Sequence, residues 1–203
     1  MISAEEALAR LREGNERFVS EQRNGGYSSQ ARRMQLTDRQ EPFAIVLGCS
    51  DSRVPAEIVF DQGLGDLFVI RVAGNVVAPS QVGSVEFAAE QFHTRLVVVL
   101  GHSSCGAIAA TLDELRRPTE NQSPNLRSIV DRVRPAVEPL LAETAKLDAD
   151  TLMQRAVRAN VQASVTQLRH GSDILERLVQ GDGLLIVGAE YSLETGEVDF
   201  HDA

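Results

Sequence analysis

Short apolar runs alternate with longer segments of mixed polarity from residue 42 onward. These runs are rich in Val, Ile and Leu, and they read PFAIVLG (42–48), DLFVIRVA (66–73), TRLVVVLG (94–101) and GLLIVGAEY (183–191). Near-continuous apolar runs of this length are typical of parallel strands that are buried on both faces of a sheet. The pattern therefore predicts four strands of this kind.

The segments between the runs have the periodicity of helices. Gln81–Phe92 and Gly106–Leu115 are predicted helices, whereas residues 117–125 contain two prolines and are predicted to form a loop. Two more helices follow, and the second carries an apolar stripe at Val157, Val161, Val165 and Leu168. Strands that alternate with helices predict an α/β fold, with a central, mostly parallel sheet of four to five strands flanked by helices.

The first twenty residues predict a separate amphipathic helix. Ser3 is a suitable N-cap and Glu6 completes a capping box, and the apolar stripe consists of Ala4, Ala7, Leu8, Leu11 and Phe18. We expect residues 1–203 to form a single domain, in which residues 1–35 are an N-terminal helical arm and residues 40–203 are the α/β core. The arm is expected to lie against a partner subunit.

Composition narrows the classes of function. The chain has 203 residues, of which 43% are apolar, so it can bury a substantial core. Its net charge of -9 argues against nucleic acid as a partner, since phosphate binding requires a basic surface. The first residues lack the features of a secretory signal, and the apolar runs are too short to span a membrane. The expected location is the cytoplasm, where thiols stay reduced.

Two short clusters contain the candidate chemistry. Cys49 and Asp51 lie in LGCSDSRVPAE, and His102 and Cys105 lie in VVVLGHSSCGA; these two cysteines are the only ones in the chain. Both clusters follow predicted strands, and in open α/β sheets ligands bind outside the carboxyl ends of strands. Zinc takes sulfur and nitrogen ligands in tetrahedral geometry, and a catalytic zinc keeps one position free. We interpret the clusters as the two halves of a zinc enzyme's active site.

The spacing inside each cluster supports this interpretation. In an extended segment alternate residues share a face, so Cys49, Asp51 and Arg53 would point the same way. His102 and Cys105 are three residues apart, which suits a helical turn or a tight loop. From the residues alone, inert core thiols, a redox pair and a structural zinc remain alternatives. A structural zinc, however, would leave Asp51 and Arg53 without a role.

The motifs CSDSR (49–53), RVAGN (71–75) and GHSSCGA (101–107) resemble those of the β-class carbonic anhydrases. Gln40-Glu41-Pro42 precedes the first cysteine as the family's Q-x-P does, and residues 160–168 resemble its N-V-x-x-S-V-x-x-L. The resemblance extends over nearly the whole chain. It implies reversible hydration of carbon dioxide to bicarbonate and a proton by zinc-bound hydroxide, with one zinc ion per subunit.

The resemblance also implies roles for individual residues. Cys49, His102 and Cys105 would bind zinc, and Asp51 would either be the fourth ligand or be held away from the metal by Arg53. These last two residues would be catalytic. Substrate would be bound by Gln40 and the backbone N–H of Gly106, beside an apolar pocket lined by Phe68 and Phe87, with Ala73 nearby.

One position departs from part of the family. Members in which the aspartate switches onto the metal under bicarbonate control carry Trp three residues before the first cysteine, and here that residue is Val46. Arg71 and Tyr191 match the other partners of that Trp. Without the indole the regulatory bicarbonate pocket is incomplete, so the sequence favours the constitutively open subtype.

Three other functions compete with this one. They are hydrolysis of carbon disulfide or carbonyl sulfide on the same scaffold, a catalytically silent zinc protein, and a redox-sensing thiol protein. The resemblance further implies a homodimer or a dimer of dimers, with carbon dioxide and bicarbonate as ligands and no nucleic acid or membrane partner.

Overall fold

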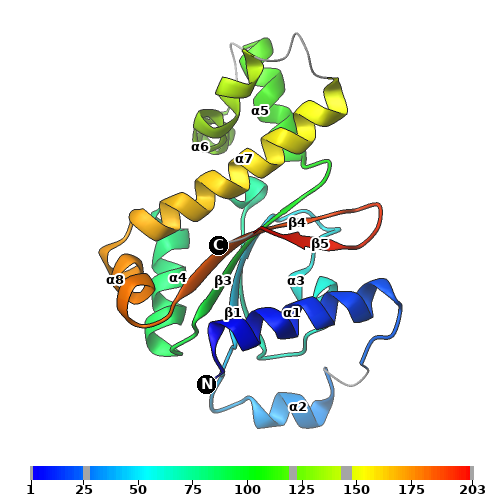
Figure 1. The fold of residues 1–203 in the computed structure, drawn as a ribbon, viewed down its shortest axis with the longest axis vertical. Helices are drawn as coiled ribbons and strands as arrows, with labels where there is room; N and C mark the ends of the chain where they lie inside the picture. Colours follow the sequence, from blue (N-terminus) through cyan, green and yellow to red (C-terminus); the bar gives the residue numbers. More distant parts are fainter. Residues whose placement is uncertain (1, 25–27, 119–122, 143–147, 202–203) are drawn as a thin grey trace.

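The computed structural model describes residues 2–24, 28–118, 123–142 and 148–201. Its centre is a five-stranded sheet in the order β2-β1-β3-β4-β5, in which neighbours among the first four strands are parallel and β5 is antiparallel to β4 (Figure 1). The strands are β1 (Ala44–Gly48), β2 (Leu67–Arg71), β3 (Leu96–His102), β4 (Leu185–Tyr191) and β5 (Val198–Phe200). The predicted α/β fold with a mostly parallel sheet is confirmed.

Helices surround the sheet in the described residues. They are α1 (Ala4–Val19), α2 (Gln30–Gln35), α3 (Ala56–Val59), the 3-10 turn η1 (Ala73–Asn75), α4 (Pro79–Gln91), α5 (Gly106–Arg116), α6 (Pro124–Leu141), α7 (Ala149–His170) and α8 (Asp173–Gly181). Part of the predicted 117–125 loop, residues 119–122, lies outside the described residues, and α6 begins before that loop was expected to end.

The two faces of the sheet hold two different cores, because side chains alternate along a strand. Ala44 and Val46 of β1 face α1 and α3, whereas Ile45 and Leu47 face the helices α4, α7 and α8. All four residues are fully buried. A third apolar cluster, formed by α5, α6 and α7, lies beyond the carboxyl ends of the strands and includes both cysteines. The sheet is therefore covered on both faces over β1 and β3, as their apolar runs predicted, whereas the residues of β2 are half-buried or exposed.

Helix α1 packs on the chain's own sheet. Its capping box is formed as predicted, by Ser3 and Glu6. Ala7 and Leu11 are buried against Phe43 and Phe60 of the same chain. The apolar stripe of this helix is therefore covered mainly within the chain, and its contact with a partner subunit stays a prediction.

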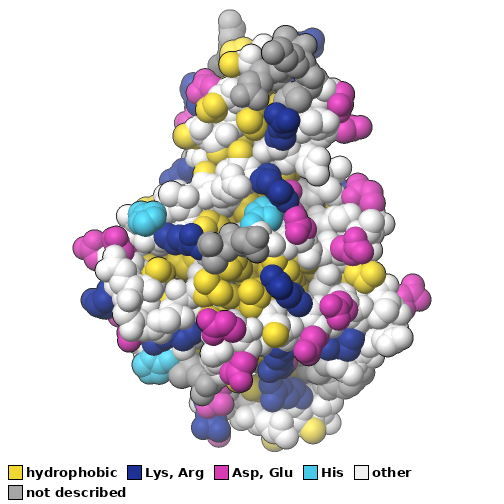
Figure 2. All heavy atoms as spheres, viewed as in Figure 1, with side chains coloured by type: hydrophobic (Ala, Val, Ile, Leu, Met, Phe, Trp, Pro, Cys, Tyr) yellow, Lys and Arg dark blue, Asp and Glu magenta, His cyan; other side chains and the backbone are white. Residues whose placement is uncertain are grey.

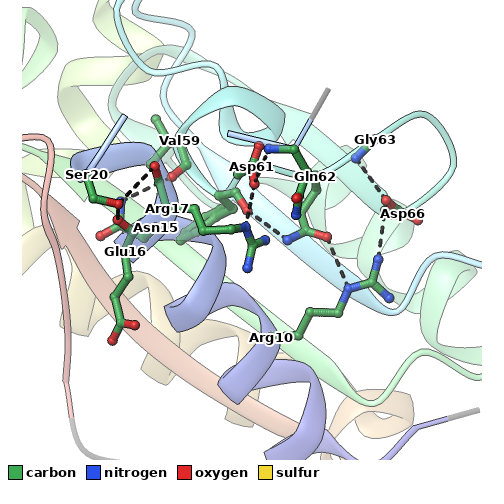
Figure 3. A network of polar contacts seen from close by, with 12 residues as sticks. Arg10, Asn15, Glu16, Arg17, Ser20, Val59, Asp61, Gln62, Gly63 and Asp66 are labelled. Carbon is green, nitrogen blue, oxygen red and sulfur yellow. Dashed lines mark hydrogen bonds and ion pairs between the residues drawn. The ribbon is translucent and has the colours of Figure 1, made fainter. Parts of the chain in front are cut away.

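Polar contacts fix α1 in this position (Figure 3). The Asn15 amide donates to the Val59 carbonyl at 3.1 Å, and the Arg17 guanidinium is 2.6 Å from the Asp61 carboxylate. Arg10 donates to the Gln62 side chain at 3.2 Å. These partners all belong to α3 or the loop after it, so α1 and this segment form one unit.

Replacing Gly14 by Ala is expected to destabilise the fold by about 3 kcal/mol, the upper end for an overpacked core. A Cβ at Gly14 would lie 1.9 Å from the Phe60 carbonyl oxygen, so the helix would have to move off the backbone beneath it. The matched control is Gly83→Ala in α4, where a Cβ meets nothing within 4 Å. That change should stabilise by about 0.5–1 kcal/mol, because Ala favours helix. Urea denaturation measures the free energy of unfolding of both variants. Equal values for Gly14→Ala and Gly83→Ala would show that α1 does not pack this closely on the Phe60 backbone.

Charges of both signs are mixed on the face of the molecule that Figure 2 shows. Arginines and acidic residues are interspersed on the face shown in Figure 2, around a hydrophobic area between α1 and α7. Within the described residues, every helix is too short or too polar to cross a membrane.

Candidate metal centre

The strand order brings the two sequence clusters together. Strand β1 lies between β2 and β3, so the chain leaves β1 toward one side of the sheet and later returns on the other. Ligands of open α/β sheets bind at such a switch point, outside the carboxyl ends of the strands. Cys49 directly follows β1, and His102 is the last residue of β3, where Gly48 is aligned with Leu100. Both clusters therefore lie at one edge of the sheet, as predicted.

Three potential ligand atoms converge at this edge. The two Sγ atoms of Cys49 and Cys105 and a ring nitrogen of His102 all lie within 4.8 Å of one another, and the three residues are buried. Ligands of a tetrahedral ion with metal–sulfur bonds of 2.3 Å are about 3.8 Å apart. The spacing therefore suits a single ion bound through sulfur and nitrogen.

The histidine is already oriented for such an ion. Nδ1 of His102 lies 2.8 Å from the Ser103 carbonyl oxygen, to which it donates as the N–H tautomer. Nε2 is buried and has no hydrogen-bond partner among the described residues. A buried nitrogen without a partner is costly, and a metal-bound histidine usually donates its other N–H to a carbonyl or carboxylate. The donor set thus fits a metal ion at Nε2.

The two thiols have different acidities in the metal-free protein. The hydrogen bond from Cys105 lowers the pKa of Cys49 to about 4, although burial works in the opposite direction. The same contact, together with burial, raises the pKa of Cys105. Burial opposes protonation of His102, but its contacts with Cys49 and the Ser103 carbonyl outweigh burial and raise its pKa. The contact between the two thiols therefore favours ionisation of Cys49 over ionisation of Cys105.

Asp51 is held by Arg53 beside these ligands. The guanidinium Nε donates to Oδ1 at 2.9 Å and Nη2 donates to Oδ2 at 2.8 Å, a bidentate pair. These bonds hold the pKa of Asp51 well below its usual range. Oδ2 lies 3.9 Å from Nε2 of His102, so the carboxylate borders the ligand cluster without joining it.

The local conformation of this segment differs from the expectation. Residues 51–54 form a turn, closed by the bond from the Val54 N–H to the Asp51 carbonyl at 3.1 Å. The predicted extended segment is wrong, because the Asp51 side chain accepts the Arg53 backbone N–H at 3.0 Å and so favours a turn. His102 and Cys105 are joined by a tight loop, in which Ser104 has a φ of 54°.

Several hydrogen bonds around the cluster involve residues to which the sequence analysis gave no role at the metal. Arg71 donates to the carbonyl oxygens of Cys49 and Asp51, and the Gly74 N–H donates to Cys49 Sγ at 3.3 Å. The Ser103 hydroxyl donates to the Glu194 carboxylate at 2.8 Å. The RVAGN motif was a signal for Arg71 and Gly74, but the chain offered no signal for Glu194.

The five predicted substrate-binding residues fall into two groups. Ala73 lies in η1 next to Gly74, and Gly106 begins α5 directly after Cys105, so both border the cluster. Gln40 precedes β1, and Phe68 is aligned with Ile45 near the start of that strand. Phe68 and Phe87 contact each other, with ring centroids 6.3 Å apart. Four residues of strand, about 13 Å, separate Ile45 from Cys49. Within one chain, Gln40, Phe68 and Phe87 are therefore far from the ligand cluster.

Comparisons with known proteins identify the family of the chain. Residues 44–198 match the family model described as carbonic anhydrase. A carbonic anhydrase of Mycolicibacterium smegmatis is 41% identical over 93% of this chain and 89% of that protein. Carbonic anhydrase 2 of Mycobacterium tuberculosis is 40% identical over 95% of this chain and 90% of that protein.

Solved structures show the same relationship. A β-carbonic anhydrase of Aspergillus fumigatus superimposes with a TM-score of 0.76 at 27% identity, over 98% of this chain and 90% of that one. The β-carbonic anhydrase CcaA gives 0.76 at 28% identity, over 97% and 88% of the two chains. The chain therefore belongs to the β-class carbonic anhydrases, which are lyases that hydrate carbon dioxide.

Proposed function

We propose that the protein is a zinc enzyme that interconverts carbon dioxide and bicarbonate, with zinc held by Cys49, His102 and Cys105. The observation that supports this best is the cluster of two sulfur atoms and one unpartnered imidazole nitrogen beside a fixed carboxylate. Zinc at this site would act as a Lewis acid and lower the pKa of a water that it binds, the effect for which the three-histidine carbonic anhydrases are the type example. Two thiolates offset more of the metal's charge, so that pKa should be higher here.

The chain's own residues would orient the reactants. Asp51 stays ionised, since its pKa is lowered by Arg53, and it can accept a hydrogen bond from the attacking water. That bond would aim the oxygen's lone pair at carbon dioxide. The N–H of Gly106, at the first turn of α5, would bind an oxygen of bicarbonate, because helix N-termini favour anions.

We also propose that the resting site is open, with Asp51 away from the metal. Both carboxylate oxygens already accept bonds from Arg53. The guanidinium of Arg71 is engaged by two backbone carbonyls, and Val46 is buried inside β1, where the bicarbonate-regulated members carry Trp. These features support the constitutively open subtype.

The test of the function is stopped-flow hydration of carbon dioxide, with the zinc content measured on the same sample. Hydration in proportion to bound zinc is the expected result. Zinc-loaded protein that hydrates no faster than buffer would favour the silent zinc protein instead. Carbon disulfide and carbonyl sulfide, offered in parallel, distinguish the other hydrolytic reactions on this scaffold.

Zinc affinity is expected to increase with pH. The ligands must be deprotonated to bind, and the thiol of Cys105 stays protonated in the metal-free protein because its pKa is raised. Binding thus releases one proton from Cys105, and a second from His102 below the pKa of that residue. Affinity should increase about tenfold per pH unit with one proton released, and more steeply at lower pH. Competition with a chelator at pH 6, 7 and 8 measures the slope, and a constant affinity would contradict these ligands.

We propose a homodimer formed through β2. This strand is at the edge of the sheet with one neighbour, and its residues are half-buried or exposed, whereas β1 and β3 are fully buried. Phe87 is 52% exposed beside it, and Gln40 is exposed. A second copy on this edge could bring its Gln40, Phe68 and Phe87 to the metal centre that they do not reach within one chain. A cytoplasmic location is also proposed, because the thiols must remain reduced to bind zinc.

Phe87→Glu is expected to convert the dimer to monomers, since a carboxylate buried in an apolar interface is unpaired. Sedimentation velocity should show the mass falling to that of one chain, 22.1 kDa. The control is Val179→Glu in α8, which is 36% exposed and away from β2. A Phe87→Glu variant that sediments like the unaltered protein would place the interface elsewhere.

A further inference from the structure

The turn η1 next to the metal centre has an unusual backbone. Gly74 has a φ of 68° and Asn75 a φ of 44°, so two successive residues are in the left-handed region. Glycine adopts this conformation easily and Asn tolerates it, but a pair of such residues persists only where the surroundings hold it. The turn also carries the N–H that donates to Cys49 Sγ.

Helix α7 supplies the two groups that hold this turn. The Asn160 amide nitrogen donates to the Gly74 carbonyl at 2.9 Å, and the Ser164 hydroxyl donates to the Asn75 carbonyl at 3.3 Å. The two side chains are four residues apart, hence on one face of the helix. Both are buried. They are the polar members of the 160–168 motif, for which the function proposed above gives no role.

Packing alone does not explain these polar side chains. The other buried residues of α7 are apolar and belong to the clusters beneath it, for example Val161 and Leu168. A buried amide costs free energy unless it is hydrogen-bonded, so an apolar residue at Asn160 would serve the helix equally well. What Asn160 adds is a fixed position for Gly74.

We propose that Asn160, assisted by Ser164, is a positioning residue of the metal centre, which keeps the Gly74 N–H directed at the Cys49 sulfur. The inference rests on the proposed zinc site. A hydrogen bond to a ligating sulfur withdraws electron density from it and fixes its direction. Removing a group that hydrogen-bonds to a metal ligand typically lowers the metal affinity by about 10–100-fold.

Asn160→Leu removes the donor, keeps the number and branching of the side-chain heavy atoms, and is the direct test. Zinc transfer to excess chelator should become about 10–100-fold faster, measured at a temperature at which circular dichroism shows the variant folded. In the cobalt-substituted protein the sulfur-to-metal charge-transfer band should move to longer wavelength, because a sulfur without its N–H donor is more electron-rich. Ser164→Ala should change the rate of zinc transfer and the position of the cobalt band in the same direction, but by a smaller amount.

Leu168→Ala is the matched control. Leu168 is fully buried in the same helix, but it packs in the cluster with α4 and α8, and its truncation lowers stability without touching η1. The control should release zinc at the unaltered rate with an unaltered cobalt band. Equal acceleration in both variants, or an unaltered rate and band in Asn160→Leu, would overturn the inference. If Asn160→Leu fails to fold, an unaltered Ser164→Ala protein overturns it. Wild-type protein that binds no zinc would instead refute the proposed function.

Discussion

Replacing Asp51 by Asn is expected to lower the rate of carbon dioxide hydration by about 10²–10⁴-fold and to leave zinc bound, the usual effect of losing a positioned acid–base group. The carboxylate borders the ligand cluster without belonging to it, so the metal should be retained. An amide lacks the negative charge, and its NH₂ group would face the donors of Arg53 where an oxygen now accepts them. Stopped-flow rates, normalised to zinc content, measure the loss.

Two arginine substitutions accompany this test. Arg53→Lys should also be harmful, because an ammonium group cannot hold both oxygens of the carboxylate as the planar guanidinium does. Arg39→Lys is the matched control, since Arg39 forms an exposed ion pair with Glu41 on the surface. Exposed ion pairs contribute little to stability, so the Arg39→Lys variant should hydrate carbon dioxide at the unaltered rate. An Asp51→Asn enzyme with full activity and stoichiometric zinc would exclude this residue from the reaction.

Replacing Cys105 by Ser is expected to abolish tight zinc binding and, with it, activity. Structural zinc sites with four ligands bind with about 10–16 kcal/mol, so one lost ligand costs roughly 3 kcal/mol, or about 10²-fold or more in affinity. The fold should survive, because Cys105 is the N-cap of α5 without a side-chain capping bond, and Ser is among the best N-cap residues.

Zinc analysis after dialysis against a chelator measures this effect, and circular dichroism checks the helix content. The unaltered protein, stripped of metal and then given zinc, should regain its activity. The Ser variant should not regain it at the same zinc concentration. A Ser variant that keeps one zinc per chain after dialysis would show that other groups bind the metal.

The long elements could be predicted because their patterns are strong. The four apolar runs coincide with β1 to β4. The strands β1 and β3 are buried on both faces and have no room for polar residues, whereas the edge strand β2 is half-buried or exposed within one chain. The helices α2, α3 and α8 and the strand β5 were not predicted. Three of these elements, α2, α3 and β5, have six, four and three residues, too few to establish a period, and α8 has nine residues. The alternation of elements predicted the sheet, but the order of its strands follows from packing and was not readable from sequence.

The candidate site was predictable at the level of side-chain chemistry. Cys49, His102 and Cys105 combine zinc-type ligands at strand ends, and the structure brings them together. Contacts made through the backbone were not predictable. No spacing rule tells which carbonyl the guanidinium of Arg71 reaches, or that the N–H of Gly74 meets a sulfur. Residues 51–54 form a turn and not an extended segment, because the Asp51 side chain accepts a hydrogen bond from the Arg53 backbone N–H.

The closeness of the two sulfur atoms has a consequence for handling the protein. The two sulfur atoms lie within 4.8 Å of each other, and the hydrogen bond from Cys105 lowers the pKa of Cys49, which favours its thiolate form. A thiolate is the reactive form of cysteine, so dissolved oxygen or peroxide would attack this position first. A metal ion bound at this site would therefore protect the thiolate, and metal-free stocks are expected to need a reductant from the moment that the chelator is added.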